Sequence, residues 1–316
     1  MHPIFLNIVS GSAMFYLLLS IFCGTALVVV FKFFPKYKID TFQAIVVNYW
    51  TCFLVGALML GRVPIDASTF TQPWMPYAAV LGLMFITGFY AVGMTVNLFG
   101  LTVATVLQKM SLVISVPFAF LMFSEEVTVL KVIGLLLALT AVVLTNWQTK
   151  KDNTENESST VRKAFVENGG SALLLWIFPI YAFIVSGGIE VVLQYVQDSM
   201  LPDSDATNAF STTLFTTAGV LGTIIAVYLI VVGRSKLKLR NVIAGFVLGL
   251  PNYFSIFFLV MAFSYWDKSM VLPINNIAIV SASALLGFIA FREKLSNINW
   301  IGVFIAILAI GLISFN

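Results

Sequence analysis

The sequence predicts an all-α membrane protein with ten transmembrane helices, arranged as two inverted five-helix repeats. Its composition, ten long apolar runs and a match of the chain to itself all favour this fold class. Of the 316 residues, 60% are hydrophobic and only 10% are charged, whereas a soluble domain carries about 25% charged residues. So few charges cannot cover a water-facing surface, and most of the chain must face lipid or other helices.

Ten apolar runs approach or exceed the length that a helix needs to cross a bilayer, which is about 20 residues. Charges, prolines and glycines separate them into 12–33, 41–60, 74–98, 102–123, 129–147, 172–194, 206–232, 242–265, 270–291 and 299–314. A barrel strand alternates over only about ten residues, and an open sheet leaves its backbone unsatisfied in lipid. We therefore expect every run to be helical.

A hydrophilic linker at 148–170 separates the predicted five-helix halves, 1–147 and 171–316. Assigning the loops alternately to two faces gives one face thirteen cationic residues, namely Lys32, Lys36, Lys38, Lys150, Lys151, Arg162, Lys163, Arg234, Lys236, Lys238, Arg240, Arg292 and Lys294. The other face has only Arg62, Lys131 and Lys268. Because cationic loops stay in the cytoplasm, we expect a cytoplasmic linker and external termini, in a bacterial plasma (inner) membrane.

An internal repeat appears when the chain is compared with itself at an offset of 168 residues. The segment Phe123-Ser-Glu125-Glu-Val-Thr falls on Phe291-Arg-Glu293-Lys-Leu-Ser, and Ile133-Gly134 falls on Ile301-Gly302, without gaps. Five spans per half is an odd number, so the second half must run through the membrane inverted relative to the first. Inverted repeats are typical of carriers that alternate access around a site near the midplane.

These motifs resemble those of the drug/metabolite transporter superfamily, in its ten-span form with two EamA-like domains. The resemblance covers roughly 12–147 and 172–314, and it implies a secondary carrier of amino acids, sugars, sugar phosphates or drugs. It also implies a substrate cavity between the halves, lined by the first, third and fourth helices of each. The predicted external termini depart from many bacterial members, whose termini are cytoplasmic.

Only two charges lie well inside the predicted spans, Lys109 and Glu190. An ionisable group there costs about 2.5–3.5 kcal/mol on insertion scales and usually faces a cavity. Lys109, with its neighbour Gln108, is a candidate anchor for a substrate carboxylate or phosphate; sugar-phosphate carriers of the resembled superfamily place a lysine in this helix. The alternative is a lysine that reaches the interface along its stem. Glu190 is the candidate for proton coupling, because burial favours a protonated carboxyl group; the alternative is a hydrated carboxylate near a helix end.

Two polar segments complete the predicted substrate site. Asn275 and Asn276 follow Pro273 in the ninth run, at the repeat position of Leu107 and Gln108. Proline frees a backbone carbonyl, and weakened helices at corresponding places of two halves point to a transporter site. Asn252 and Tyr253, after a proline in the eighth run, are further candidates. The alternative for Asn275 and Asn276 is hydrogen bonding between helices, which is common in membranes.

The sequence favours a carrier over an enzyme. His2 is the only histidine, and no metalloprotease motif, nucleophile elbow or carboxylate cluster is present. No phosphate-binding glycine loop indicates direct use of ATP. We therefore expect no enzymatic activity, no metal, no cofactor and no nucleic-acid partner. A non-transporting receptor would need no inverted repeat.

We accordingly expect secondary active transport of a small organic solute, an amino acid or a related metabolite, with anionic solutes included. The alternative is an exporter of drugs or cationic compounds coupled to protons. The expected partners are the solute, a coupling proton and the lipid bilayer, and the chain is expected to be a monomer or a homodimer.

Overall fold

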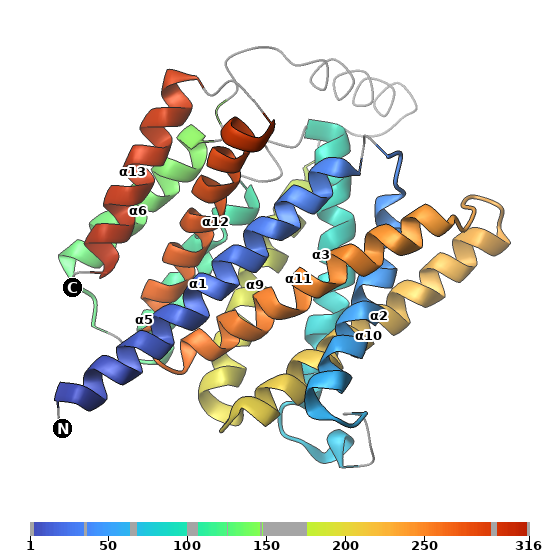
Figure 1. Ribbon diagram of the computed structural model, residues 1–316, viewed down its shortest axis with the longest axis horizontal. Helices are drawn as coiled ribbons and strands as arrows, with labels where there is room; N and C mark the ends of the chain where they lie inside the picture. Colours follow the sequence, from blue (N-terminus) through green and yellow to red (C-terminus); the bar gives the residue numbers. More distant parts are fainter. Residues whose placement is uncertain are drawn as a thin grey trace. The chain divides into compact units, whose positions relative to one another are not determined.

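The described residues of the computed structural model are 3–34, 37–63, 68–99, 107–124, 126–145, 147, 176–291 and 296–314. They contain no strand and form the helices α1 (Pro3–Phe33), α2 (Thr41–Leu60), α3 (Met75–Phe99), α5 (Leu112–Met122), α6 (Val129–Thr145), α9 (Ile177–Met200), α10 (Ser204–Val231), α11 (Leu239–Phe263), α12 (Lys268–Phe291) and α13 (Asn297–Ser314), drawn in Figure 1. Thr69–Thr71 adds a 3₁₀ turn. Each predicted run falls on a helix, so the all-helical prediction is confirmed for these residues. The predicted linker, Glu125 and Glu293 lie outside them.

Seven helices in the described part of the chain are long and apolar enough to cross a membrane. They are Met14–Phe31, Thr41–Leu60, Met75–Val92, Ile177–Met200, Ser204–Val231, Leu239–Phe263 and Lys268–Ile289. Three shorter apolar helices are Leu107–Met122, Val129–Thr145 and Asn297–Ile313. Large apolar side chains point outward, among them Phe22, Leu58 and Leu121 with 71%, 81% and 83% exposure. The protein is therefore a helical membrane protein whose outer surface suits lipid.

The start and end of α2 show how local chemistry sets the helix bounds. The Asp40 carboxylate accepts the backbone N–H of Gln43 at 3.2 Å, which satisfies one of the free amides of the first turn. At the other end Gly61 adopts φ 65°, and its N–H donates to the Leu58 carbonyl at 3.2 Å. Glycine has no Cβ to oppose this left-handed conformation, so the helix ends there.

The prolines inside the later helices do not interrupt them. Both α11 and α12 continue through Pro251 and Pro273, so neither proline divides its helix, and the weakened turn at Pro273 stays a prediction. A break occurs instead in the fourth run, where 107–109 are helical, 110–111 form a turn and α5 begins at Leu112. Residues 100–106, the earlier part of that run, lie outside the described residues.

Two compact units divide the chain, and each draws helices from both predicted halves. Unit 1 comprises Met1–Ile86 and Val192–Trp266, and unit 2 comprises Thr87–Val191 and Asp267–Asn316. The boundaries fall inside α3 and α9. The compact units therefore do not coincide with the predicted halves, and the duplication stays a prediction.

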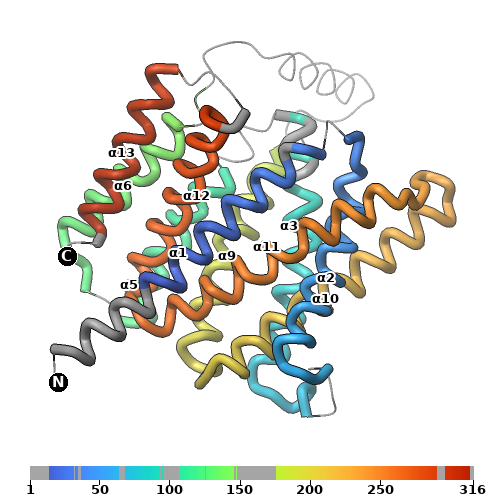
Figure 2. The backbone as a smooth tube through the Cα atoms, viewed as in Figure 1, coloured from blue at the N-terminus to red at the C-terminus, as the bar shows by residue number. Residues whose placement is uncertain are grey.

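Unit 1 is organised around α2, which packs against α10 and α11, while α11 also packs against α1 (Figure 2). Glycines allow the close approach. A Cβ at Gly245 would collide with the Ala44 carbonyl, and one at Gly249 would collide with Thr51. Small residues that let helix backbones approach are the usual packing device in membranes, where van der Waals contact replaces the hydrophobic force.

Unit 2 is organised around the pair α6 and α13, with α12 contacting α5, α6 and α13. Its tightest core consists of small and apolar residues from three helices, Ala138, Ala141, Ile277, Ala306 and Ala309. The Asn299 amide of α13 donates to the carbonyls of Leu144, Thr145 and Trp147 at 2.8–3.1 Å. It thereby satisfies the free carbonyls at the end of α6 and joins the two helices.

Candidate functional site

A polar cluster inside unit 2 joins both charges that the sequence placed within the spans. The Lys109 ammonium donates to the Asn276 carbonyl oxygen at 2.8 Å. The same amide donates from its nitrogen to Glu190 Oε1 at 3.0 Å, and the Ser115 hydroxyl donates to Glu190 Oε2 at 2.6 Å. Asn276 thus lies between a cation and an anion, with its carbonyl oxygen toward the cation and its amide nitrogen toward the anion. We call these four residues the charged cluster.

Three membrane-embedded segments supply the charged cluster. Glu190 lies near the middle of α9, so the alternative of a carboxylate close to a helix end does not hold. Asn276 lies in α12 and is 5% exposed. Ser115 belongs to α5 and is fully buried. Lys109 and Glu190 are partly buried and are close enough to interact electrostatically.

The helix break beside Lys109 fixes the local geometry of the cluster. The turn at 110–111 replaces a regular turn of helix, and the Ser111 hydroxyl donates to the Gln108 carbonyl at 2.7 Å. Irregular backbone inside a membrane is tolerated only where protein or a water-filled cavity surrounds it. The lysine therefore projects from the end of a helical segment.

Close packing of α9 supports the same region. A Cβ at Gly187 would collide with the Ile114 side chain of α5, and one at Gly88 with Val185 of α9. These glycines bring α3, α5 and α9 close together within unit 2. Close backbones and short side chains hold Glu190 where Ser115 and Asn276 reach both of its oxygens.

The charged cluster contains a cation, an anion and the Asn276 amide, whose hydrogen bond to either one can be replaced by a ligand. A carboxylate or phosphate could replace the Asn276 oxygen at Lys109, and an ammonium group could replace its nitrogen at Glu190. Hydrogen bonds to charged groups are about twice as strong as neutral ones. A ligand with both a carboxylate and an ammonium group would thus replace the Asn276 amide at Lys109 and at Glu190. The hydrogen bonds that it forms would offset those that the amide loses.

The other predicted site residues divide between the two units. Gln108 is exposed, and Asn275 is buried at 5% exposure in unit 2. Asn252 and Tyr253 lie in unit 1. The Asn252 amide donates to Asn48 at 3.1 Å, and the buried Tyr253 hydroxyl donates to Asn208. Those two contacts join α11 to α2 and α10.

Ser115 is the residue of the cluster that sequence reasoning did not assign to the site. Ser115 falls on Ser283 at the repeat offset of 168 residues, and one serine in an apolar run gives no sign of a role. A signal was present in the chain, because α5 carries a hydroxyl six residues beyond the intramembrane lysine. That spacing alone does not distinguish a carboxylate partner from a helix-packing hydroxyl.

The fold and the cluster define the class: a helical membrane protein with an intramembrane charge pair held by a shared amide. No protein-family model matches the chain. It is 27% identical over 301 residues to a protein of Haemophilus influenzae (strain ATCC 51907 / DSM 11121 / KW20 / Rd) described as uncharacterized, covering 93% of this chain and 95% of that one.

A solved structure described only as the crystal structure of a protein is similar across almost its whole length. The TM-score is 0.72 at 13% identity, with 96% of this chain and 97% of the other covered. A likeness at that identity concerns the fold alone, and it indicates that this arrangement of helices occurs in another protein of comparable extent.

Proposed function

We propose that the protein is a secondary active transporter that moves a small organic solute, an amino acid or a related metabolite, by alternating access. We further propose that it belongs to the drug/metabolite transporter superfamily, with ten spans in two inverted EamA-like halves. The observation that carries the proposal is the charged cluster of Lys109, Asn276, Glu190 and Ser115. Ionisable residues inside spans mark substrate or ion pathways by default.

Helix pairing supports the inverted repeat. In the order of the predicted runs, α2 and α10 are the second helices of their halves, α5 and α12 the fourth, and α6 and α13 the fifth. All three of these pairs are in contact. Contact between equivalent elements is what a two-fold relation between halves produces near its axis.

The proposed orientation follows from the charge count. The chain would lie in a bacterial plasma membrane with 148–170 in the cytoplasm and both termini outside. The even number of proposed spans requires the termini to share a side. Single cysteines at either terminus should then react with an impermeant maleimide in intact cells.

An exporter of cationic compounds coupled to protons is the second candidate, and Glu190 is the observation that favours it. A carboxylate hydrogen-bonded by two neutral donors can exchange a proton for a cationic ligand. The two candidates differ in the role of Lys109, because an anion needs that cation and a cationic drug does not.

The test is counterflow of a radiolabelled amino acid mixture into liposomes that contain the purified chain. We expect the label to accumulate above its level in empty liposomes. Counterflow should be about tenfold slower with Lys109→Gln, because one charge-assisted contact to the solute is lost. We expect Glu190→Gln to retain counterflow but to lose acceleration by an inward proton gradient.

The controls are Arg62→Gln and Glu126→Gln, which change exposed charges outside the cluster, and both should behave like the unmodified chain. Cationic-compound export that survives Lys109→Gln, with no amino acid counterflow, would favour the second candidate. Absence of counterflow for amino acids, organic acids and cations alike would overturn the proposal of transport.

A further inference from the structure

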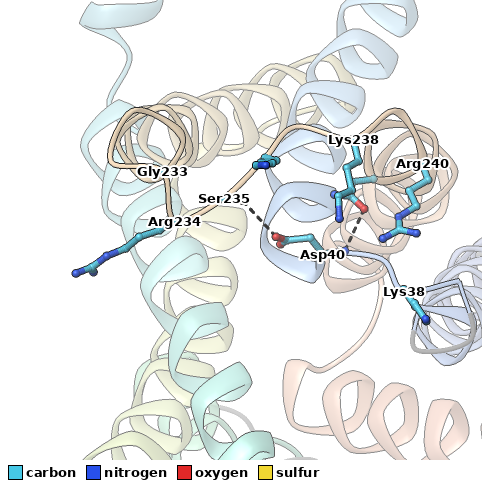
Figure 3. Close-up of a pocket in the computed structure, with 9 residues that line it drawn as sticks. Lys38, Asp40, Gly233, Arg234, Ser235, Lys238 and Arg240 are labelled. Atoms are coloured by element: carbon cyan, nitrogen blue, oxygen red, sulfur yellow. Dashed lines mark hydrogen bonds between the residues drawn. The ribbon is translucent and has the colours of Figure 1, made fainter.

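A cationic pocket lies in unit 1, where the chain passes from α1 to α2 and from α10 to α11. Its volume is about 300 Å³, and its lining consists of Lys38, Asp40, Gly233, Arg234, Ser235, Lys236, Lys238, Arg240 and Asn241. A water molecule occupies about 30 Å³ in the liquid, so a phosphate group fits. Figure 3 shows Lys38, Lys238 and Arg240 on one side of Asp40, with Arg234 directed away from them.

The charge of this lining is strongly unbalanced, with five cationic side chains and one carboxylate. All five cationic residues are exposed, and within the described residues none of their side chains donates a hydrogen bond or forms an ion pair. The Asp40 carboxylate is already engaged, because it accepts from the Gln43 N–H at 3.2 Å and from the Ser235 hydroxyl at 3.4 Å. The cations therefore remain available to an external anion.

A buried amide network fixes the shape of the pocket. Asn241 is 1% exposed; its oxygen accepts the Asp40 N–H at 3.1 Å, and its nitrogen donates to the Gln43 oxygen at 2.7 Å. The Gln43 nitrogen donates to the Ser235 hydroxyl at 2.6 Å and to the Lys236 carbonyl at 3.0 Å. These contacts join the two connections, so the cations project from a backbone that is already ordered.

The position of the pocket relative to the spans indicates its ligand. Four candidate spans end or begin beside it, at Phe31, Thr41, Val231 and Leu239. Its lining residues lie in the connections between those ends or in the first turn of α11, which is the depth of phospholipid headgroups. Basic pockets between helix ends at this level bind anionic headgroups. In addition, α11 begins here without a side-chain cap, and the N-terminus of a helix favours an anion.

We propose that this pocket binds the phosphate group of an anionic phospholipid. The phosphate oxygens accept from Lys238, Arg240 and Lys38, while the acyl chains lie along the apolar helix surface. The site is independent of the transport proposal, since it uses no residue of the charged cluster.

Native mass spectrometry of the full chain in detergent, titrated with phosphatidylglycerol, tests the proposal. Each cation near the surface contributes enough that its loss should weaken binding about fivefold, so Lys238→Gln with Arg240→Gln should weaken it about 25-fold. Lys38→Gln, which lies in the connection between α1 and α2, should weaken lipid binding about fivefold. The matched control is Arg62→Gln, an exposed cation at the opposite end of α2, which should leave binding unchanged.

Three results would overturn the assignment. Equal affinity of the double variant and Arg62→Gln for phosphatidylglycerol would remove the pocket from the binding site. Equal affinity of the unmodified chain for phosphatidylcholine would remove the requirement for an anionic lipid. Inorganic phosphate that displaces the lipid at equal concentration would identify free phosphate as the ligand. A melting curve without lipid checks that each variant is folded. If the double variant does not fold, the affinity of Lys38→Gln still decides the test.

Discussion

The two compact units use buried polar side chains in different ways. In unit 1 the hydrogen bonds between helices described above are neutral: Asn252 of α11 donates to Asn48 of α2, and Tyr253 of α11 donates to Asn208 of α10. In unit 2 the corresponding contacts involve full charges, with an amide between an ammonium and a carboxylate. Both sets join helices, but only the second contains a lysine and a carboxylate, which can carry full charges.

The two kinds of contact differ in the free energy of placing their side chains inside the membrane. A neutral hydrogen bond between membrane helices contributes about 0.6 kcal/mol on average, which is enough to fix an orientation. An ionisable residue in the same place costs about 2.5–3.5 kcal/mol to insert. Neutral hydrogen bonds are sufficient for helix packing, so the extra cost of the charges in unit 2 supports the proposal that a ligand uses them.

The largest effect is expected when Lys109 is replaced by Met. Glu190 is then left without its cationic neighbour. Removing one partner of a fully buried pair costs about 3–5 kcal/mol, which is the upper bound for these partly buried groups. Unfolding of the purified chain in mixed micelles by dodecyl sulfate titration measures the loss. The double variant with Glu190→Gln should recover much of the stability, and a double variant as unstable as Lys109→Met would show that the two charges are not coupled.

A smaller effect is expected at the close approach of α2 and α11 in unit 1. Gly245→Ala places a Cβ against the Ala44 backbone, and overpacking of this kind costs about 1–3 kcal/mol. The control is Gly311→Ala in α13, which has open space at its Cβ and should gain up to about 1 kcal/mol from helix propensity. Similar unfolding midpoints for both variants would contradict the proposed packing.

A still smaller effect is expected for the neutral contacts of unit 1. Asn252→Leu removes the donor to Asn48, and such bonds contribute about 0.6 kcal/mol and at most about 1.7 kcal/mol. The same titration measures the change. A loss as large as that of Lys109→Met would remove the distinction between the neutral and the charged contacts.

The smallest effect is expected for a half-exposed ion pair of unit 2. Lys131 donates to Asp267 at 2.7 Å, with side-chain exposures of 5% and 49%. An amide at 267 still accepts this bond, so Asp267→Asn should cost less than about 1 kcal/mol. Added salt should reduce the difference further, and a salt-independent loss of several kcal/mol would contradict this interpretation.

Much of the fold was predictable from the sequence because apolar run length decides where helices cross lipid. The runs matched helices from 41–60 to 299–314, and the charge-poor composition identified the environment. Which helices make up each of the two units was not predictable, because α2 packs against α10 and α11, which are more than a hundred residues away in the sequence. Run lengths contain no information on which helices pack together.

The candidate site was predictable as a set of residue types and not as a contact. Lys109 and Glu190 were recognisable because charges are costly in lipid, and Asn276 because of its proline-containing segment. The repeat alignment paired Asn276 with Gln108, yet one is buried in the cluster and the other exposed. Likewise Ser115 binds Glu190, while its repeat partner Ser283 has a buried hydroxyl with no hydrogen-bond partner in the described part of the chain.

The interleaving of the units has a consequence during synthesis. Helix α2 ends at Leu60, but its neighbour α11 is complete only at Phe263, about 200 residues later. At about 5–20 residues per second, the early helices wait roughly 10–40 s in the bilayer before their permanent neighbours arrive. During that time the early helices lie in the bilayer without the helices that they contact in the folded protein.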